Sequence, residues 1–115
     1  MASDIPFELS WSEHHGASVL AVRGEVDVAT APQLRERLEA MAEEGTTMAV
    51  VDLSEVSFVD STALGVLVTG AKRLRKGGGD LRLVVTEPHI AKVFTITGLD
   101  EVFTIFPTAS AALSA

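Results

Sequence analysis

A strand pattern that leads within a few residues into a helix pattern is the feature that most constrains the fold of this chain. The segment Met48–Leu53 has a continuous apolar core, which is typical of a strand covered on both faces in the middle of a sheet. Residues 54–60 alternate irregularly between polar and apolar and predict a short loop, after which Ser61 opens a helix. A buried strand joined to a helix in this way predicts an α/β layer fold.

The segments before this unit predict a β-hairpin and a helix. Apolar and polar residues alternate over residues 7–11, and a second strand pattern over residues 19–22 follows the polar break at residues 14–16. Thr30 stands three residues before Gln33, which is the spacing of a capping box, and the apolar residues that follow repeat at helical spacing. The chain is therefore predicted to open with two paired strands and an amphipathic helix.

The segments after this unit continue the alternation of strands and helices. The predicted elements are a helix over residues 61–76, a strand over 81–85, a helix over 88–97, a strand over 102–106 and a final turn or two of helix over 108–113. Parallel strands joined by helices need right-handed crossovers, so we expect a mixed, mostly parallel sheet of about five strands with helices packed on it. We expect one domain over residues 1–115, with residues 1–5 and 110–115 frayed.

Composition narrows the classes of partner and compartment. Sixteen acidic residues against nine basic ones give a formal net charge of −7, which disfavours a nucleic acid or an anionic membrane as the partner. The chain has no cysteine, and its N-terminus, MASDIPFELS, lacks the basic and apolar regions of a signal peptide. No apolar stretch approaches the ~20 residues that span a bilayer. We therefore expect a cytoplasmic protein.

The sequence offers no catalytic, cofactor or metal motif. Ser61 lacks the glycine flanks of the G-x-S-x-G nucleophile elbow, and the chain has only three histidines. The three glycines at 77–79 follow a helix pattern instead of preceding one, so they do not form a phosphate-binding loop. Adjacent side chains such as His14 and His15 point to opposite faces of a strand, which favours an exposed turn over a metal site. We expect no enzymatic activity, no cofactor and no metal.

Ser61 follows Asp60 at the predicted start of the second helix, and two roles fit that position. A hydroxyl there can cap the unpaired backbone N–H groups of the first helical turn. The same N–H groups and the helix dipole also tolerate an added phosphate. Gly65 and Gly70 cost helix stability relative to alanine, which indicates close packing or the close approach of a partner. Local chemistry leaves the choice between a cap and a switch open.

Three segments resemble the STAS domain family and, within it, the bacterial anti-sigma factor antagonists. They are SFVDSTALGVLV around Ser61, the tetrapeptide Gly24–Asp27, and Phe94–Leu99. The resemblance covers nearly the whole chain and implies a single STAS domain. It also implies that Ser61 is the phosphorylated residue and that the partner interface includes Gly24, Glu25, Asp27, Asp60, Thr62 and Gly65. One departure is Ala63, where many members have glycine, and it bears on the choice of partner more than on the fold.

The resemblance further implies a mechanism of partner switching. In this family the unphosphorylated antagonist binds an anti-sigma factor, usually a serine kinase of the histidine-kinase-like ATPase fold, and so releases the sigma factor. Phosphorylation of the serine by that kinase abolishes binding, and a PP2C-type phosphatase restores it. Phosphate on Ser61 adds a charge of about −1.5 to −2 beside Asp60, and near Glu25 and Asp27 if the two loops share an edge of the sheet. The alternative is a STAS interaction module of a stressosome-like or other signalling assembly.

Overall fold

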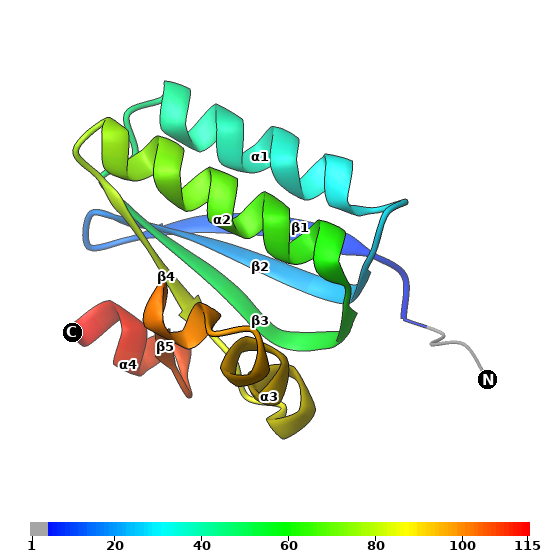
Figure 1. Ribbon diagram of the computed structural model, residues 1–115. Helices are drawn as coiled ribbons and strands as arrows, with labels where there is room; N and C mark the ends of the chain where they lie inside the picture. The colour runs from blue at the N-terminus through cyan, green and yellow to red at the C-terminus, as the bar shows by residue number, and fades with distance from the viewer. Residues whose placement is uncertain (1–4) are drawn as a thin grey trace.

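Residues 5–115, which the computed structural model describes, form a five-stranded sheet and four α-helices (Figure 1). The elements in chain order are β1 (Glu8–His14), β2 (Ala17–Val26), α1 (Ala31–Glu43), β3 (Met48–Val59), α2 (Ser61–Lys76), β4 (Asp80–Val84), α3 (Pro88–Ile96), the 3₁₀ turn η1 (Leu99–Glu101), β5 (Thr104–Phe106) and α4 (Ala109–Ser114). The predicted α/β class is confirmed.

The sheet follows the chain order β1-β2-β3-β4-β5. β1 and β2 form the predicted antiparallel hairpin, with His14 opposite Ala17, and the other neighbouring strands pair in parallel. Both residues of the hairpin turn have positive φ, 50° at His15 and 85° at Gly16, which is the type I′ geometry that joins two strands in two residues. β3 lies in the middle of the sheet, as its continuous apolar pattern predicts.

The two faces of the sheet are covered to different extents. Alternate residues of a strand point to opposite faces, so Val51 and Val50 enter different apolar clusters. Val51 belongs to the large core, to which α1 contributes Leu34 and α3 contributes Phe94. Val50 belongs to a small cluster that Ala112 of α4 covers. Figure 1 shows α1 and α2 packed side by side along one face of the sheet.

β3 is longer than the sequence pattern predicts. Within the segment predicted as a loop, 54–60, the strand continues to Val59, and Asp60 alone separates β3 from α2. The pairing with β2 shifts register twice, and each shift adds one residue to β3. The buried residues Leu53, Val56 and Val59 are therefore spaced by three instead of two. The period of a strand is lost at these two bulges, and for this reason the loop prediction was wrong.

The start of α1 differs from the predicted capping box. Thr30 occupies the N-cap position, but its side chain accepts no hydrogen bond from the N–H of Gln33. Its hydroxyl instead donates to the carbonyl of Glu25 at 2.8 Å and accepts from the N–H of Asp27 at 3.0 Å. Oδ1 of Asp27 accepts from the N–H groups of Ala29 and Thr30 at 2.9 and 3.1 Å. Asp27 and Thr30 together hold the loop between β2 and α1.

The C-terminal part of the chain contains a shorter last strand than predicted and a 3₁₀ turn that the sequence pattern does not predict. η1 occupies residues 99–101, so β5 begins at Thr104 instead of residue 102. α4 buries Ala112 completely, and the carbonyl of Ala112 accepts a hydrogen bond from Nη1 of Arg82 at 2.7 Å. α4 occupies Ala109–Ser114, where the sequence predicts a turn or two of helix over residues 108–113. The fraying of residues 1–5 and 110–115 stays a prediction, and residues 1–4 lie outside the described residues. No helix in the described part of the chain is long and apolar enough to cross a membrane.

Candidate functional site

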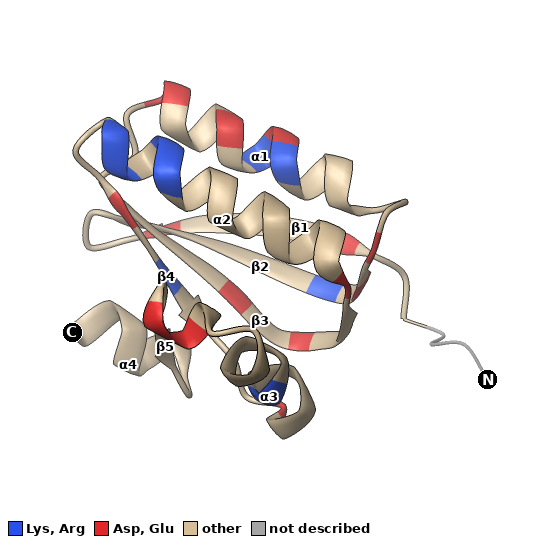
Figure 2. Ribbon diagram, in the orientation of Figure 1, with Lys and Arg blue, Asp and Glu red and all other residues tan. Residues whose placement is uncertain are grey.

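The candidate site lies where β2 and β3 end and α2 begins. The two strands are parallel, and their pairing continues to Val26 opposite Val59, so both end at the same edge of the sheet. The backbone N–H of Asp60 then donates to the carbonyl of Val26 at 3.3 Å, which ties the start of α2 to the end of β2. Figure 2 shows acidic residues gathered at this edge. The two segments that carry the predicted interface residues are therefore neighbours.

Asp60 is the N-cap residue of α2. Its backbone is extended, with φ −114° and ψ −177°, and its Oδ1 accepts a hydrogen bond from the N–H of Ala63 at 2.9 Å. Its carbonyl accepts the first helical hydrogen bond, from the N–H of Leu64 at 3.1 Å. Because Asp60 performs the cap, the hydroxyl of Ser61 is not needed for it.

Ser61 is the first residue of α2, and its side chain is exposed. Among residues 5–115, no group forms a hydrogen bond with its hydroxyl. The position lies at the positive end of a 16-residue helix, where a negative charge is favourable. The hydroxyl is thus accessible, uncommitted and placed where an attached phosphate is electrostatically tolerated.

Thr62 and Gly65 extend the exposed surface along the first turns of α2. A Cβ at Gly65 would meet no heavy atom within 4 Å. A Cβ at Gly70, by contrast, would lie 2.7 Å from Cδ1 of Leu38 on α1. The two helical glycines therefore have different causes: Gly70 permits α1 and α2 to pack closely, whereas no packing within the described chain accounts for Gly65.

Gly24, one of the predicted interface residues, lies inside β2 and is buried. Its φ is +94°, a left-handed conformation that favours glycine. A Cβ there would lie 3.1 Å from Cα of Phe7 and 3.2 Å from the carbonyl oxygen of Ile5. The close approach of the segment before β1 explains this glycine without a partner protein.

Glu25 and Asp27 are half-buried on either side of Val26. Glu25 lies opposite Phe58 in the pairing of β2 with β3. The carboxylate of Asp27 holds the start of α1 by accepting hydrogen bonds from the N–H groups of Ala29 and Thr30. None of the carboxylates of Glu25, Asp27 and Asp60 forms an ion pair with another described residue. The edge of the sheet around Ser61 is therefore acidic and lacks neutralising cations.

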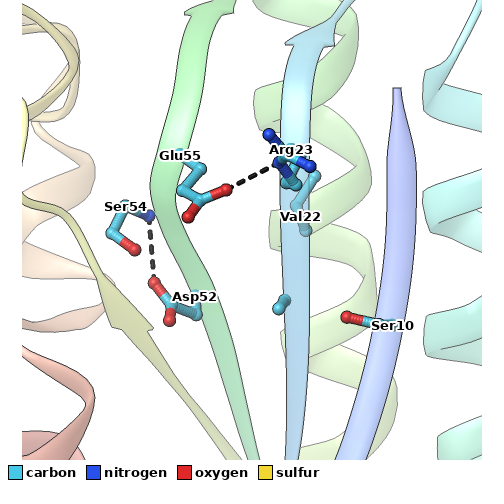
Figure 3. A pocket seen from close by; sticks show the side chains of 7 residues that line it. Ser10, Val22, Arg23, Asp52, Ser54 and Glu55 are labelled. Atoms are coloured by element: carbon cyan, nitrogen blue, oxygen red, sulfur yellow. Dashed lines mark hydrogen bonds and ion pairs between the residues drawn. The ribbon is translucent and has the colours of Figure 1, made fainter. Parts of the chain in front are cut away.

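A shallow pocket of about 260 Å³ lies on the face of the sheet opposite α1 and α2 (Figure 3). Its only lining cation, Arg23, pairs with Glu55 at 2.6 Å, and Asp52 accepts a hydrogen bond from the N–H of Ser54 at 2.9 Å. No group of three or more His, Cys, Asp or Glu side chains in residues 5–115 is arranged to hold a metal ion.

Comparison with known proteins gives the family. The model of the STAS domain matches residues 9–112. The anti-sigma-B factor antagonist of Bacillus subtilis (strain 168) is 42% identical over 84 residues, which are 73% of this chain and 76% of the relative. The putative anti-sigma factor antagonist BtrV of Bordetella bronchiseptica is 32% identical over 108 residues, which are 94% of this chain and 93% of the relative.

Solved structures agree with this match. The crystal structure of an anti-sigma factor antagonist from Mycobacterium paratuberculosis superposes with a TM-score of 0.85 at 32% identity, covering 99% of this chain and 97% of the other. The structure of the Bacillus cell fate determinant SpoIIAA in its phosphorylated form has the same fold, with a TM-score of 0.71 at 24% identity over 95% of this chain and 97% of the other. This chain belongs to the STAS domain family, in which the relatives that it matches are anti-sigma factor antagonists.

Proposed function

We propose that this chain is an anti-sigma factor antagonist and that phosphorylation of Ser61 switches it off. The observation that carries the proposal is the state of the Ser61 hydroxyl, which is exposed at a helix N-terminus while Asp60 performs the cap. The names of the relatives support the antagonist role. The existence of a phosphorylated SpoIIAA, a protein with this fold, supports the modification.

The fold accommodates a phosphate on Ser61. The modification adds a charge of about −1.5 to −2 at the first residue of α2, where the helix dipole and the free N–H groups favour an anion. The side chain is exposed, so the phosphate displaces no packed group. We therefore expect the phosphorylated chain to keep its fold and to change its surface only.

The surface change is large for a partner. Glu25, Asp27 and Asp60 already make this edge acidic without ion pairs among the described residues. A partner that buries the neutral hydroxyl of Ser61 would have to desolvate a phosphate dianion next to these carboxylates. Binding is lost because the partner gains no cation to match the new charge.

Gly65 supports a partner that lies directly on α2. It is exposed one turn after Ser61, and nothing in the described chain occupies the space beside it. An exposed glycine inside a helix costs up to ~1 kcal/mol relative to alanine. A partner that contacts the helix at Gly65 would explain why a destabilising glycine occupies this position. Thr62 is exposed on the same turns of α2, between Ser61 and Gly65.

The chemistry belongs to the partners. The anti-sigma factor acts as the serine kinase that phosphorylates Ser61, and a PP2C-type phosphatase removes the phosphate and restores binding. The chain itself supplies the substrate hydroxyl and the docking surface, and acts without a cofactor. Its partners place it in the cytoplasm.

Mass spectrometry after incubation with a candidate anti-sigma factor and ATP tests the proposal. We expect one phosphate on the wild-type chain and none on Ser61→Ala. The matched control is Ser57→Ala, since it removes an exposed hydroxyl outside the proposed interface. This control should still gain the phosphate.

Binding measurements test the switch itself. Isothermal titration of the anti-sigma factor should show that Ser61→Asp binds at least tenfold more weakly than the wild type, which corresponds to ~1.4 kcal/mol. Phosphate on another residue, or equal affinity of Ser61→Asp and phosphorylated wild type with the unmodified chain, contradicts the proposal. A large homomeric complex without kinase binding favours the signalling-assembly alternative instead.

A further inference from the structure

β1 is an edge strand without the usual protection. Among the described residues it pairs with β2 alone, and the other edge strand, β5, has only three residues. An edge strand presents unpaired N–H and C=O groups to which another strand can add. Proline, lysine and β-bulges commonly block such addition, but β1 has the sequence ELSWSEH and a regular register with β2.

The hairpin geometry identifies the backbone groups that face outward. A two-residue hairpin is closed by a hydrogen-bonded pair, which here is His14 and Ala17. Hydrogen bonds to β2 then recur at every second residue of β1, counted from His14 back towards Glu8. The N–H and C=O groups of Leu9, Trp11 and Glu13 therefore point away from β2, to the open edge.

A groove runs along this open edge between β1 and α1. Its volume is about 310 Å³, and it is lined by Leu9, Gln33, Glu36, Arg37 and Ala40. Trp11 continues it along β1: its ring is 3.9 Å from the guanidinium carbon of Arg37, yet 55% of the residue is exposed. This β1–α1 groove thus has free backbone groups on one side and a helix on the other.

We propose that the β1–α1 groove binds an extended segment of a partner protein, which adds to the sheet as a strand antiparallel to β1. In an antiparallel pair, residues that exchange hydrogen bonds with Leu9 and Trp11 point their side chains to the same face as these two residues, towards α1. That face of the groove offers Leu9, Trp11 and Ala40. The segment therefore carries apolar residues at alternate positions.

The charge around the groove indicates which residues of the bound segment fit the positions between its apolar ones. Glu13 and Glu36 are exposed on the α1 side of the groove, Glu8 is exposed on the opposite face of β1, and the full chain carries a net charge of −7. The nearby cation, Arg37, already contacts the ring of Trp11, and its Nη2 lies 3.5 Å from Oε1 of Glu44. The residues between the apolar ones point to the face of the sheet that carries Glu8, so basic residues there complement Glu8 and the net charge of the chain, whereas the β1 of a second copy would bring the same glutamates.

The tryptophan of the groove provides a direct readout. Trp11 is the only tryptophan of the chain, so its fluorescence reports on the groove alone. The probe is the synthetic peptide acetyl-KVKVKVK-amide, added to the full chain. We expect a saturable blue shift of Trp11 emission, together with NMR shifts of the amides of Leu9, Trp11 and Glu13.

Two N-methylated isomers of the peptide separate strand addition from charge attraction. In the proposed arrangement the valine N–H groups bond to β1 and the lysine N–H groups face solvent. Methylation of the valine nitrogens should weaken binding at least tenfold, whereas methylation of the lysine nitrogens should leave it within a factor of about three. Equal affinity of the two isomers, or no binding of the parent peptide, overturns the proposal.

Variants of the protein locate the site. Ala40→Arg fills the groove with a cation and should abolish the Trp11 shift, whereas Thr69→Arg, which adds the same charge at an exposed position of α2, should preserve it. Ser61→Asp should also bind the peptide normally, because the groove acts independently of the switch. Loss of binding in Thr69→Arg, or dimerisation of the free chain through Trp11 in sedimentation, contradicts the assignment to a basic partner segment.

Discussion

The carboxylate of Asp60 accepts a hydrogen bond from the backbone N–H of Ala63 at 2.9 Å, which makes Asp60 the cap of α2. We predict that Asp60→Ala lowers the free energy of unfolding by ~1 kcal/mol, because the N–H of Ala63 loses its acceptor. Asp60→Asn keeps an acceptor and should lose only a small part of that amount. Urea denaturation measures both, and a larger loss in Ser61→Ala than in Asp60→Ala would show that the cap is misassigned.

The two glycines of α2 should respond to alanine in opposite directions. At Gly70 the new Cβ would lie 2.7 Å from Cδ1 and 3.3 Å from Cβ of Leu38, so the buried side chain of Leu38 must shift or α1 and α2 must move apart. We predict that Gly70→Ala lowers the free energy of unfolding by ~1–3 kcal/mol. Gly65→Ala meets open space and should raise it by up to ~1 kcal/mol. Thermal or urea denaturation of the pair checks both signs.

Gly65→Ala also tests the proposed interface. If a partner approaches α2 at this residue, the more stable variant should bind the anti-sigma factor more weakly than the wild type. Thr69→Ala, at an exposed position one turn further along α2, is the matched control and should bind normally. Unchanged affinity of Gly65→Ala would remove Gly65 from the interface.

The order of strands and helices was predictable because most elements keep one apolar period along their length. β3 shows why the remainder was not. Its two bulges depend on its register with β2, which is a long-range property. At the bulges the buried residues are three positions apart instead of two, so the sequence over residues 54–59 does not show the period of a strand. Sequence spacing also favoured a capping box from Thr30 to Gln33. Instead, the N–H of Thr30 donates to Asp27, and the hydroxyl of Thr30 is engaged with the backbone of Glu25 and Asp27.

The candidate site was predictable in part for the same reason. The motif around Ser61 lies within one strand and one helix, so its local geometry follows from the sequence. The role of Gly24 depends on a segment 17 residues earlier, around Phe7, which no local pattern indicates. The distinct roles of Gly65 and Gly70 likewise depend on α1, which packs over only one of them.

Alanine substitutions at Gly24 and Gly16 measure how much the close approach of the segment around Phe7 to Gly24 affects the stability of the fold. Both have positive φ, +94° and +85°, so alanine is strained at either position. Only at Gly24 would the new Cβ also meet backbone atoms of Phe7, at 3.1 and 3.2 Å. We predict that Gly24→Ala destabilises the fold more than Gly16→Ala, by ~1–3 kcal/mol. Equal melting temperatures of the two variants would mean that the contact between Gly24 and the segment around Phe7 adds nothing to the loss of stability.

Asp80, at the start of β4, makes the stability of the chain depend on pH. Partial burial raises the pKa of its carboxyl, but this effect is outweighed by the hydrogen bond from Nε of Arg75 at 2.8 Å, the hydrogen bond from the N–H of Leu81, and the charges of Arg75 and Arg82. The net result is a pKa below the ordinary value of 3.8. The ionised form is thus favoured by folding.

A folded-state pKa that lies below the unfolded value gives stability that is fully present above the unfolded pKa. This stability is lost as the pH falls through the folded pKa. We predict that Asp80→Asn is less stable than the wild type at pH 7 and that the difference shrinks once the pH falls below 3.8. Urea denaturation across this range measures it, with Asp100→Asn as the control for loss of an exposed carboxylate. A difference that stays constant with pH would show that Arg75 stabilises Asp80 by geometry and not by charge.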